Sequence, residues 1–309
     1  MKWLVVGAGA IGGYFGGRLA QAGRDVTFLV HAKRQGQLQS AGLSIESPHG
    51  PAHVAHPSTL LAEQLSAPYD VVLVSCKAYD LPSAMDAFAP AVGPRTAILP
   101  LLNGLSHVGA LQQRFGADHV LGGMCVISVA LDGNGTVRHL NQAHRLVYGE
   151  LDGKRSDRAS AIQSDFSGAA FDAQLSANVQ QEMWEKWVLI ATVAGATCLM
   201  RAAICDIVKA GSKDFITGLF EECSAVAAVN GFAPRPAARE RLLAFSTNPE
   251  STLTASMMKD MEHGARIEGE HIIGELIRHA GADTAKLRLL PIVHTHLCAY
   301  EARRSRENT

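Results

Sequence analysis

The first half of the chain alternates between short apolar runs and segments whose apolar positions have helical spacing. Each apolar run is short enough for a strand that is buried on both faces. The runs lie at 3–6, 26–30, 70–74 and 96–99. Shorter strands are expected at 43–46 and 52–54, as an excursion at the edge of the same sheet. Because strands that alternate with helices form parallel sheets, we predict an α/β domain with a mostly parallel, doubly wound sheet.

Near residue 175 the pattern changes to long helical segments rich in Ala, Leu and Met. Before that point, the chain runs through 120–131 to a turn expected at 132–135. Strands are expected near Val137 and over 146–148, and a helix from about Lys154. After it, helices are expected from Asn178 onward and over 213–230, 236–245, 252–280 and 283–300. We therefore predict an α/β domain over 1–175 and an all-α domain over 176–309. A single barrel is the alternative for a chain of 309 residues.

A glycine pattern, Gly7-x-Gly9-x-x-Gly12, follows the first strand and opens the first helix. In a Rossmann-type fold the first glycine allows a sharp turn, the second lets the backbone approach a pyrophosphate, and the third lets the helix pack close to the strand. The free N–H groups of the helix N-terminus then face the anion. The alternative is that the glycines serve tight packing alone. The residues predicted to contact a dinucleotide here are Gly7, Ala8, Gly9, Ala10, Ile11 and Gly12.

The residues after the second strand indicate which dinucleotide is preferred. A protein that prefers NAD carries Asp or Glu about 20 residues beyond the glycines, where the carboxylate accepts hydrogen bonds from the ribose. This chain has His31, Lys33 and Arg34 there, so positive charge is placed to contact a 2′-phosphate. The alternative is that Lys33 and Arg34 are solvated residues at the start of the next helix. We predict NADPH as the cofactor, with His31 and Arg34 at its site.

Two further polar residues follow buried strands. Lys77 comes after the strand over 70–74, and Asn103 comes after the strand over 96–99. Ligands of open parallel sheets bind outside the carboxyl ends of the strands. Position alone therefore makes Lys77 and Asn103 candidate cofactor residues.

Lys186 is a conspicuous charge in the helical half. The chain is apolar at nearly every position from Trp187 to Ala194. A helix that is apolar all round is normally buried, and a lysine is rarely enclosed without a partner. Lys186 is thus a candidate catalytic residue. The alternative is a lysine that extends past Trp184 and Trp187 to water.

Glu268 is the second candidate in the helical half. Ser256, Gly264 and Glu268 recur at helical spacing, so one helix over 252–280 would turn Ser256 and Glu268 toward the same cleft. The alternative for Glu268 is a solvated helix face shared with Arg266 and Glu270.

Composition narrows the class of protein. A net charge of −1 with 47% hydrophobic residues describes an ordinary globular chain and gives no basis for nucleic-acid binding. The six cysteines form no C-x-x-C pair, which favours reduced thiols in a cytoplasmic protein. The chain begins with a strand and has no apolar run of ~18 residues, so neither export nor membrane insertion is expected. The histidines, including His263, His294 and His296, lack a convincing ligand set, and no metal is expected.

Several motifs occur together in this chain. They are the glycine segment over 7–19, Cys76-Lys77-Ala-Tyr-Asp, Asn103-Gly104, Met183-Trp-Glu-Lys186, and Ser256-Met-Met-Lys-Asp with Glu268. In this order and across both halves, they resemble the ketopantoate reductase (2-dehydropantoate 2-reductase) family. The resemblance implies a Rossmann domain followed by a helical domain, with NADPH and the substrate in the cleft between them.

The resemblance also implies roles for individual residues. Lys186 resembles the proton-donating lysine of the family, and Glu268 resembles its active-site glutamate. Lys77 and Asn103 resemble the residues near the nicotinamide. The substrate would contact Lys186, Asn103 and Ser256.

The chain departs from the family at the substrate. Ile190 and Ala194 stand four and eight residues after Lys186, where the family commonly has asparagines that hold the substrate. In addition, His31 stands in place of a common arginine, and Leu102 in place of a glutamine. The cofactor residues and the proton donor are therefore kept while the polar substrate contacts are reduced. We expect a 2-oxo acid more apolar than ketopantoate.

The same chemistry follows from the residues. Hydride addition to a ketone builds negative charge on oxygen, which a lysine ammonium stabilises and protonates. Glu268 would orient Lys186 or bind a substrate hydroxyl. We predict NADPH-dependent reduction of a small 2-oxo acid, and a homodimer is a possible assembly. One alternative is a β-hydroxyacid dehydrogenase, but the predicted helix from Ser256 to Glu268 disfavours it. The other is an NADP-binding redox sensor without turnover, but the presence of Lys186 and Glu268 disfavours it.

Overall fold

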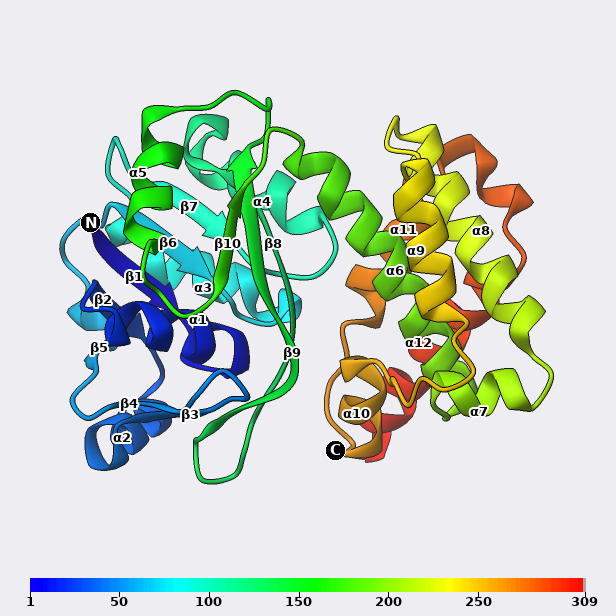
Figure 1. Ribbon diagram of the computed structural model, residues 1–309, viewed down its shortest axis with the longest axis horizontal. Helices are drawn as coiled ribbons and strands as arrows, with labels where there is room; N and C mark the ends of the chain where they lie inside the picture. Colours follow the sequence, from blue (N-terminus) through cyan, green and yellow to red (C-terminus); the bar gives the residue numbers. More distant parts are fainter. Residues whose placement is uncertain (308–309) are drawn as a thin grey trace. The chain divides into compact units, whose positions relative to one another are not determined.

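The protein consists of two compact units in the computed structural model, which describes residues 1–307 (Figure 1). Unit 1 comprises Met1–Leu102 and His107–Val179. Unit 2 comprises Asn103–Ser106 and the chain from Gln180 onward. The sequence prediction placed a single boundary at residue 175. The structure divides the chain after Val179 and also assigns the short loop of Asn103–Ser106 to unit 2.

The main sheet of unit 1 has five strands, all parallel, in the order β5-β2-β1-β6-β7. Its strands are β1 (Lys2–Val6), β2 (Asp25–Leu29), β5 (Ser58–Leu60), β6 (Val71–Val74) and β7 (Ala97–Pro100). The chain order runs outward in both directions from β1, which makes the carboxyl ends of β1 and β6 the switch point where such sheets bind ligands. The predicted doubly wound α/β fold is confirmed.

Both faces of this sheet are buried, which explains the unbroken apolar runs. Along β1, Trp3 and Val5 pack into one apolar cluster and Leu4 and Val6 into another. Helices α1 and α5 contribute side chains to the first cluster, and α3 and α4 to the second. The helices of unit 1 are α1 (Ala10–Gln21), α2 (Ala32–Ala41), α3 (Leu81–Phe88), α4 (Ser106–Phe115) and α5 (Asp157–Phe166), with short helical turns η1 (Ala62–Gln64), η2 (Ala78–Asp80), η3 (Ala89–Ala91) and η4 (Ala117–His119).

A second sheet corrects two expectations from the sequence. Its strands are β3 (Leu43–Glu46), β4 (Ala52–Val54), β8 (Leu121–Leu131), β9 (Val137–Glu150) and β10 (Asp172–Leu175). The expectation that 43–46 and 52–54 lie at the edge of the main sheet is wrong, because β3 pairs with β4 and β9. The two strands expected near Val137 and over 146–148 are one strand. Most of its middle residues are exposed and polar, so the apolar pattern is interrupted there. The register with β8 also shifts there, between His139, which pairs with Val129, and His144, which pairs with Ile127.

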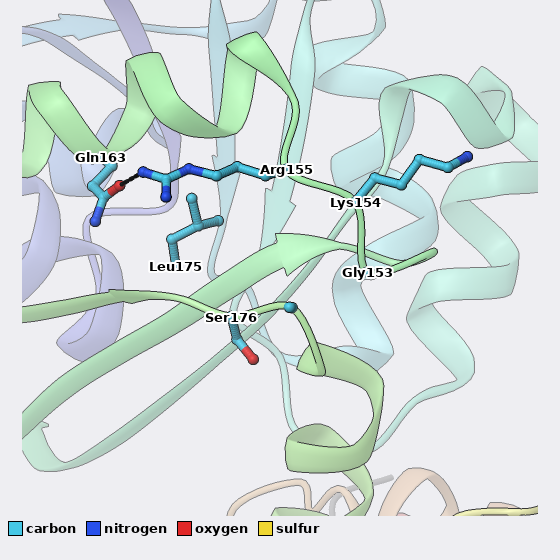
Figure 2. A pocket seen from close by; sticks show the side chains of 7 residues that line it. Gly153, Lys154, Arg155, Gln163, Leu175 and Ser176 are labelled. Carbon is cyan, nitrogen blue, oxygen red and sulfur yellow. Dashed lines mark hydrogen bonds between the residues drawn. The ribbon is translucent and has the colours of Figure 1, made fainter.

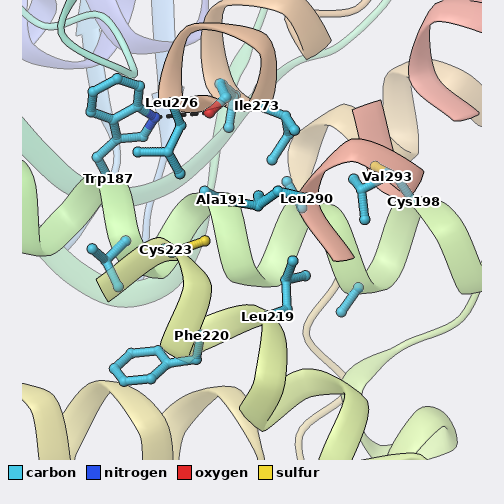
Figure 3. Packing of buried hydrophobic residues seen from close by; sticks show 14 of the residues in the cluster. Trp187, Ala191, Cys198, Leu219, Phe220, Cys223, Ile273, Leu276, Leu290 and Val293 are labelled. Carbon is cyan, nitrogen blue, oxygen red and sulfur yellow. Dashed lines mark hydrogen bonds between the residues drawn. The ribbon is translucent and has the colours of Figure 1, made fainter. Parts of the chain in front are cut away.

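Unit 2 is helical, as predicted, and is built around α6. Its helices are α6 (Val179–Met200), α7 (Ile204–Lys209), α8 (Lys213–Val229), α9 (Pro236–Ser246), α10 (Ser256–Glu262), η5 (Glu270–Gly274), α11 (Glu275–His279), η6 (Gly281–Lys286) and α12 (Leu289–Glu307). Figure 3 shows Trp187 and Ala191 of α6 packed with Leu219 of α8 and Val293 of α12 in the core. Among residues 1–307, no helix combines the length and apolar character needed to cross a bilayer.

The single helix predicted over 252–280 is wrong. Helix α10 ends at Glu262, and Gly264 adopts a φ of 68°, a left-handed conformation that stops a helix. Residues 265–268 have no regular structure, and the chain then re-enters a helix through η5, which is a π-helical turn. Ser256 and Glu268 therefore do not share one helix face.

Candidate functional site

The glycine turn of unit 1 is packed tightly against the strand ends. Gly7 follows β1 with a φ of 90°, which favours glycine. A Cβ on Gly12 would lie 2.0 Å from the carbonyl oxygen of Gly7 and 2.3 Å from the Ser75 hydroxyl oxygen. The Ser75 hydroxyl donates toward the carbonyl oxygens of Val6 and Gly7, at 3.0 and 3.2 Å. Ser75 was not predicted, although its place after a buried strand was a usable signal.

Neither the backbone conformation nor the packing of the described residues requires glycine at position 9. Its φ of −78° and ψ of −153° are open to other residues. A Cβ there would meet nothing within 4 Å. Gly9 also precedes α1 without a side-chain hydrogen bond to the helix N-terminus, and the first turn of α1 carries no acidic residue. Open space beside free helix N–H groups is the arrangement that accommodates a phosphate.

Arg34 is held against the glycine turn. Its Nε donates to the carbonyl oxygen of Ala8 at 2.9 Å, and its Nη1 donates to the carbonyl oxygen of Gly135 at 3.1 Å. Its Nη2 is buried without a hydrogen-bond partner in the described residues. Burial lowers the pKa of Arg34 from its ordinary value. A cation with an unsatisfied donor beside a candidate phosphate site is suited to bind an anion.

The other predicted cofactor residues lie at element ends. His31 and Lys33 are exposed at the start of α2. Lys77 is half-buried between β6 and η2. Asn103 is half-buried in the loop assigned to unit 2, where Gly104 has a φ of 78°. A Cβ on Gly104 would lie 2.9 Å from the carbonyl oxygen of His271, so this loop packs closely on η5.

Lys186 is half-buried on α6, between two buried neighbours. Glu185 is 6% exposed by its side chain and pairs with Arg235, whose Nε and Nη2 each donate to its carboxylate at 2.7 Å. This pairing keeps the pKa of Glu185 below its ordinary value, even though burial alone would raise it. Trp187 donates its indole N–H to the carbonyl oxygen of Ile272 at 2.9 Å. The contacts of Glu185 and Trp187 therefore fix the orientation of the helix segment that carries Lys186.

Glu268 is buried, with 6% of its surface exposed, and the alternative of a solvated helix face is wrong. Its neighbour Ile267 donates its backbone N–H to the Glu301 carboxylate at 2.7 Å. The carbonyl oxygen of Glu268 accepts from the N–H of Ile272 at 3.0 Å. Helix α12 and η5 thus position Glu268, and π-helical turns of this kind are frequent at functional sites.

Ser256 is exposed at the start of α10. The preceding residue, Ala255, donates its N–H to the Thr197 hydroxyl at 3.2 Å, and that hydroxyl donates to the carbonyl oxygen of Val193 at 2.8 Å. Thr197 is fully buried and positions the helix that begins with Ser256. Where the family has asparagines, Ile190 is half-buried and Ala194 is buried.

A pocket of about 160 Å³ lies elsewhere in unit 1 (Figure 2). Its lining consists of Gly153, Lys154, Arg155, Gln163, Leu175, Ser176 and Ala177. Arg155 donates to the Gln163 side chain at 3.1 Å. The pocket contains none of the predicted cofactor or catalytic residues.

The model of a known family, described as Ketopantoate reductase PanE/ApbA, matches residues 3–153, and the model of its C-terminal part matches residues 178–301. The chain belongs to the ketopantoate reductase family. This membership confirms the resemblance expected from the motifs. It makes the chain an oxidoreductase and supports the reduction of a 2-oxo acid.

Individual relatives of this ketopantoate reductase family member cover nearly the whole chain. It is 37% identical to the uncharacterized oxidoreductase YkpB of Bacillus subtilis (strain 168), over 98% of this chain and 99% of that protein. The crystal structure of 2-dehydropantoate 2-reductase from Methylococcus capsulatus matches with a TM-score of 0.86 and 25% identity, over 99% of this chain and 98% of that one. A ternary structure of D-mandelate dehydrogenase with NADH and anilino(oxo)acetate shares the fold, with a TM-score of 0.85 and 19% identity over 99% of this chain and 100% of that one.

Proposed function

We propose that this protein reduces a 2-oxo acid to a 2-hydroxy acid with NADPH, and that Lys186 donates the proton. The observation that carries the proposal is the burial of Glu268 on a segment tied to the helix of Lys186. A buried carboxylate is normally paired with a cation or held by hydrogen bonds. Glu268 is 6% exposed, and η5, which follows it, accepts the indole N–H of Trp187 next to Lys186.

The cofactor part of the proposal rests on unit 1. The open space at Gly9 and the free N–H groups at the start of α1 suit the pyrophosphate. Arg34, fixed on the carbonyl oxygen of Ala8 with one buried donor unsatisfied, suits the 2′-phosphate of NADPH. Lys77 and Asn103 are proposed to contact the nicotinamide end of the cofactor. The bound nicotinamide would supply the hydride.

The chemistry of the remaining residues is acid catalysis and charge stabilisation. As the substrate carbonyl becomes an alkoxide, the Lys186 ammonium stabilises the negative charge and transfers its proton to that oxygen. The Glu268 carboxylate holds the ammonium in place or accepts a hydrogen bond from a substrate hydroxyl. Ser256 and Asn103 are proposed to contact the substrate. Hydride addition to the carbonyl carbon and protonation of its oxygen together convert the 2-oxo acid to the 2-hydroxy acid.

The substrate is proposed to be more apolar than ketopantoate. Ile190 offers a half-buried apolar side chain and Ala194 a buried methyl group where polar amides would hold a hydroxylated substrate. In a site that lacks hydrogen-bonding groups, a substrate hydroxyl adds little binding free energy, because the hydroxyl loses its hydrogen bonds to water and finds no partner.

The experiment that tests the function is NADPH oxidation across a panel of 2-oxo acids. The panel should contain ketopantoate, its analogue without the hydroxyl, straight-chain and branched 2-oxo acids, and a phenyl-substituted one. The last is included because a protein of the same fold is a D-mandelate dehydrogenase. Turnover of at least one 2-oxo acid supports the proposal. NADPH binding without turnover of any would favour the alternative of a redox sensor.

The β-hydroxyacid dehydrogenase alternative is tested in the reverse direction. The predicted helix that disfavoured it is interrupted at Gly264, so Ser256 and Glu268 do not share a helix face that would disfavour it. Oxidation of a β-hydroxyacid with NADP⁺ at a rate above that of any 2-hydroxy acid would support that alternative.

A cytoplasmic location and a homodimer remain parts of the proposal. Light scattering of the purified protein measures its oligomeric state.

A further inference from the structure

Three potential metal ligands of different chemistry meet on unit 2, outside the proposed catalytic residues. They are Glu270 of η5 and His294 and Cys298 of α12. His294 Nε2 lies 2.7 Å from Glu270 Oε2, and Cys298 Sγ lies 3.4 Å from His294 Nε2. One ligand atom from each lies within 4.8 Å of the others. The sequence gives no sign of this group, because Glu270 stands far from His294 and Cys298 along the chain.

The spacing suits a tetrahedral ion. With ordinary zinc bonds to nitrogen, oxygen and sulfur, neighbouring donors stand about 3.3 to 3.6 Å apart. The sulfur-to-nitrogen distance of 3.4 Å already meets this value, and the nitrogen-to-oxygen distance of 2.7 Å needs to open by less than about 1 Å. His294 and Cys298 are one helical turn apart on α12, so a rigid element presents two of the three donors.

We propose that Glu270, His294 and Cys298 bind a Zn²⁺ ion. Imidazole, thiolate and carboxylate are together the donor set of zinc, whereas Mg²⁺ and Ca²⁺ take oxygen donors. Three protein ligands leave the fourth position to water.

Arg278 orients the Glu270 carboxylate and leaves Oε2, the oxygen proposed to bind the metal, uncontacted by its own side chain. Its Nη1 donates to Glu270 Oε1, while His294 faces Oε2. A cysteine binds zinc as the thiolate, so zinc binding at Cys298 would release the thiol proton.

The ion would strengthen the connection between α12 and the segment that carries Glu268. In the described structure α12 already holds that segment through Glu301, which accepts the N–H of Ile267. His294 of α12 already contacts Glu270, the first residue of η5, at 2.7 Å, and the ion would strengthen this second link with metal bonds. The proposed site thus ties the chain on both sides of Glu268 to one helix.

The test uses the full chain, stripped of metal with a chelator and kept reduced. Zn²⁺ is titrated by calorimetry, and Co²⁺ is titrated as a spectroscopic probe for a thiolate charge-transfer band. The native protein is expected to bind one ion per chain and to show the band. Cys298→Ser should lose the band, and His294→Gln and Glu270→Gln should each weaken zinc binding by more than about 100-fold, the upper end of what changes outside the ligand set produce.

The matched control is His263→Gln, which removes an exposed histidine outside the group and should bind zinc as the native protein does. Circular dichroism verifies that each variant is folded. Native protein that binds no zinc at about 100 μM metal, or a folded Cys298→Ser variant with native zinc affinity and the same Co²⁺ spectrum, would overturn the proposal.

Discussion

The indole N–H of Trp187 donates to the carbonyl oxygen of Ile272 at 2.9 Å. This bond joins the helix that carries Lys186 to the π-helical turn that follows Glu268. Both Trp187 and Ile272 are buried, so the bond is shielded from water and fixes the two segments relative to each other. The proposed proton donor and the proposed carboxylate are therefore attached to one rigid part of unit 2.

The first prediction concerns Lys186. Replacing it with Met keeps much of the volume of the stem and removes the ammonium. The rate should fall roughly a thousandfold or more, because general acid catalysis is worth about 10²- to 10⁴-fold and charge stabilisation adds to it. Steady-state kinetics on the best substrate of the panel, with a NADPH-binding titration on the same preparation, measures this.

The matched control for that change is Lys209→Met, which removes an exposed lysine of α7. It should leave the rate nearly unchanged. A Lys186→Met variant that binds NADPH normally and stays within about tenfold of the native rate would exclude Lys186 as the proton donor.

The second prediction concerns cofactor preference. Arg34→Ala should weaken NADPH binding by about 10- to 100-fold, the value of a hydrogen bond to a charged group. NADH binding should change little, because NADH lacks the 2′-phosphate. Fluorescence titration of both cofactors measures the difference. Equal affinity of the native protein for NADPH and NADH would refute the assignment. Arg95→Ala, which removes an exposed arginine of unit 1 before β7, is the control.

The third prediction concerns the substrate. Native protein should turn over ketopantoate poorly compared with an apolar 2-oxo acid. Ile190→Asn should shift the ratio of kcat/KM toward ketopantoate by about tenfold or more, since one hydrogen bond contributes about 1 kcal/mol and an unsatisfied hydroxyl costs more. Ile190 is the better position to change because it is half-buried, whereas Ala194 is packed in the core and an added amide would strain it. Efficient native turnover of ketopantoate would contradict this view.

The fourth prediction concerns stability at the start of α9. Arg235→Met leaves the buried Glu185 carboxylate without its main partner. We expect the free energy of unfolding to fall by about 2 to 3 kcal/mol, less than for a fully enclosed pair because the Arg235 side chain is 50% exposed. Arg239→Met, which removes an exposed ion pair with Glu221, should cost less than about 1 kcal/mol. Urea unfolding of both variants measures the difference, and equal losses would argue against a special role for the buried pair.

The fifth prediction concerns a stack of histidines in unit 1. The rings of His49 and His144 are stacked with their centroids 3.7 Å apart, and His139 lies 5.9 Å from His144. The Tyr14 hydroxyl lies 2.9 Å from His144 Nδ1, and the Asp172 carboxylate lies 3.8 Å from His144 Nε2.

Burial lowers the pKa of His144 from its ordinary value, and the neighbouring His49 lowers it further. The unfolded chain then binds a proton at His144 more readily than the folded chain does. The stability is complete above the unfolded pKa of about 6.5 and is lost as the pH falls from there through the folded pKa. Urea unfolding between pH 8 and pH 5 should show this loss, and it should be smaller in His144→Gln. An identical pH dependence of the two proteins would rule out His144 as its source.

The sequence by itself determined the parts of this protein that depend on local pattern. Runs that are apolar at every position predicted strands buried on both faces, and β1, β6 and β7 are such strands. The spacing of Gly7, Gly9 and Gly12 predicted the turn and the helix that follow β1. The change to continuous helical spacing predicted a helical second half, and the order of the motifs led to the family that the matches confirm.

Tertiary structure alone decided which distant groups meet. No pattern along the chain shows that Arg34 bonds to Gly135, that Glu301 holds Ile267, or that Trp187 reaches Ile272, because such contacts depend on how whole elements pack. Helical spacing also failed between Ser256 and Glu268, since periodicity does not reveal that Gly264 takes a left-handed φ. That break leaves Glu268 on an irregular segment, where packing against α12 and η5 decides that it is buried instead of solvated.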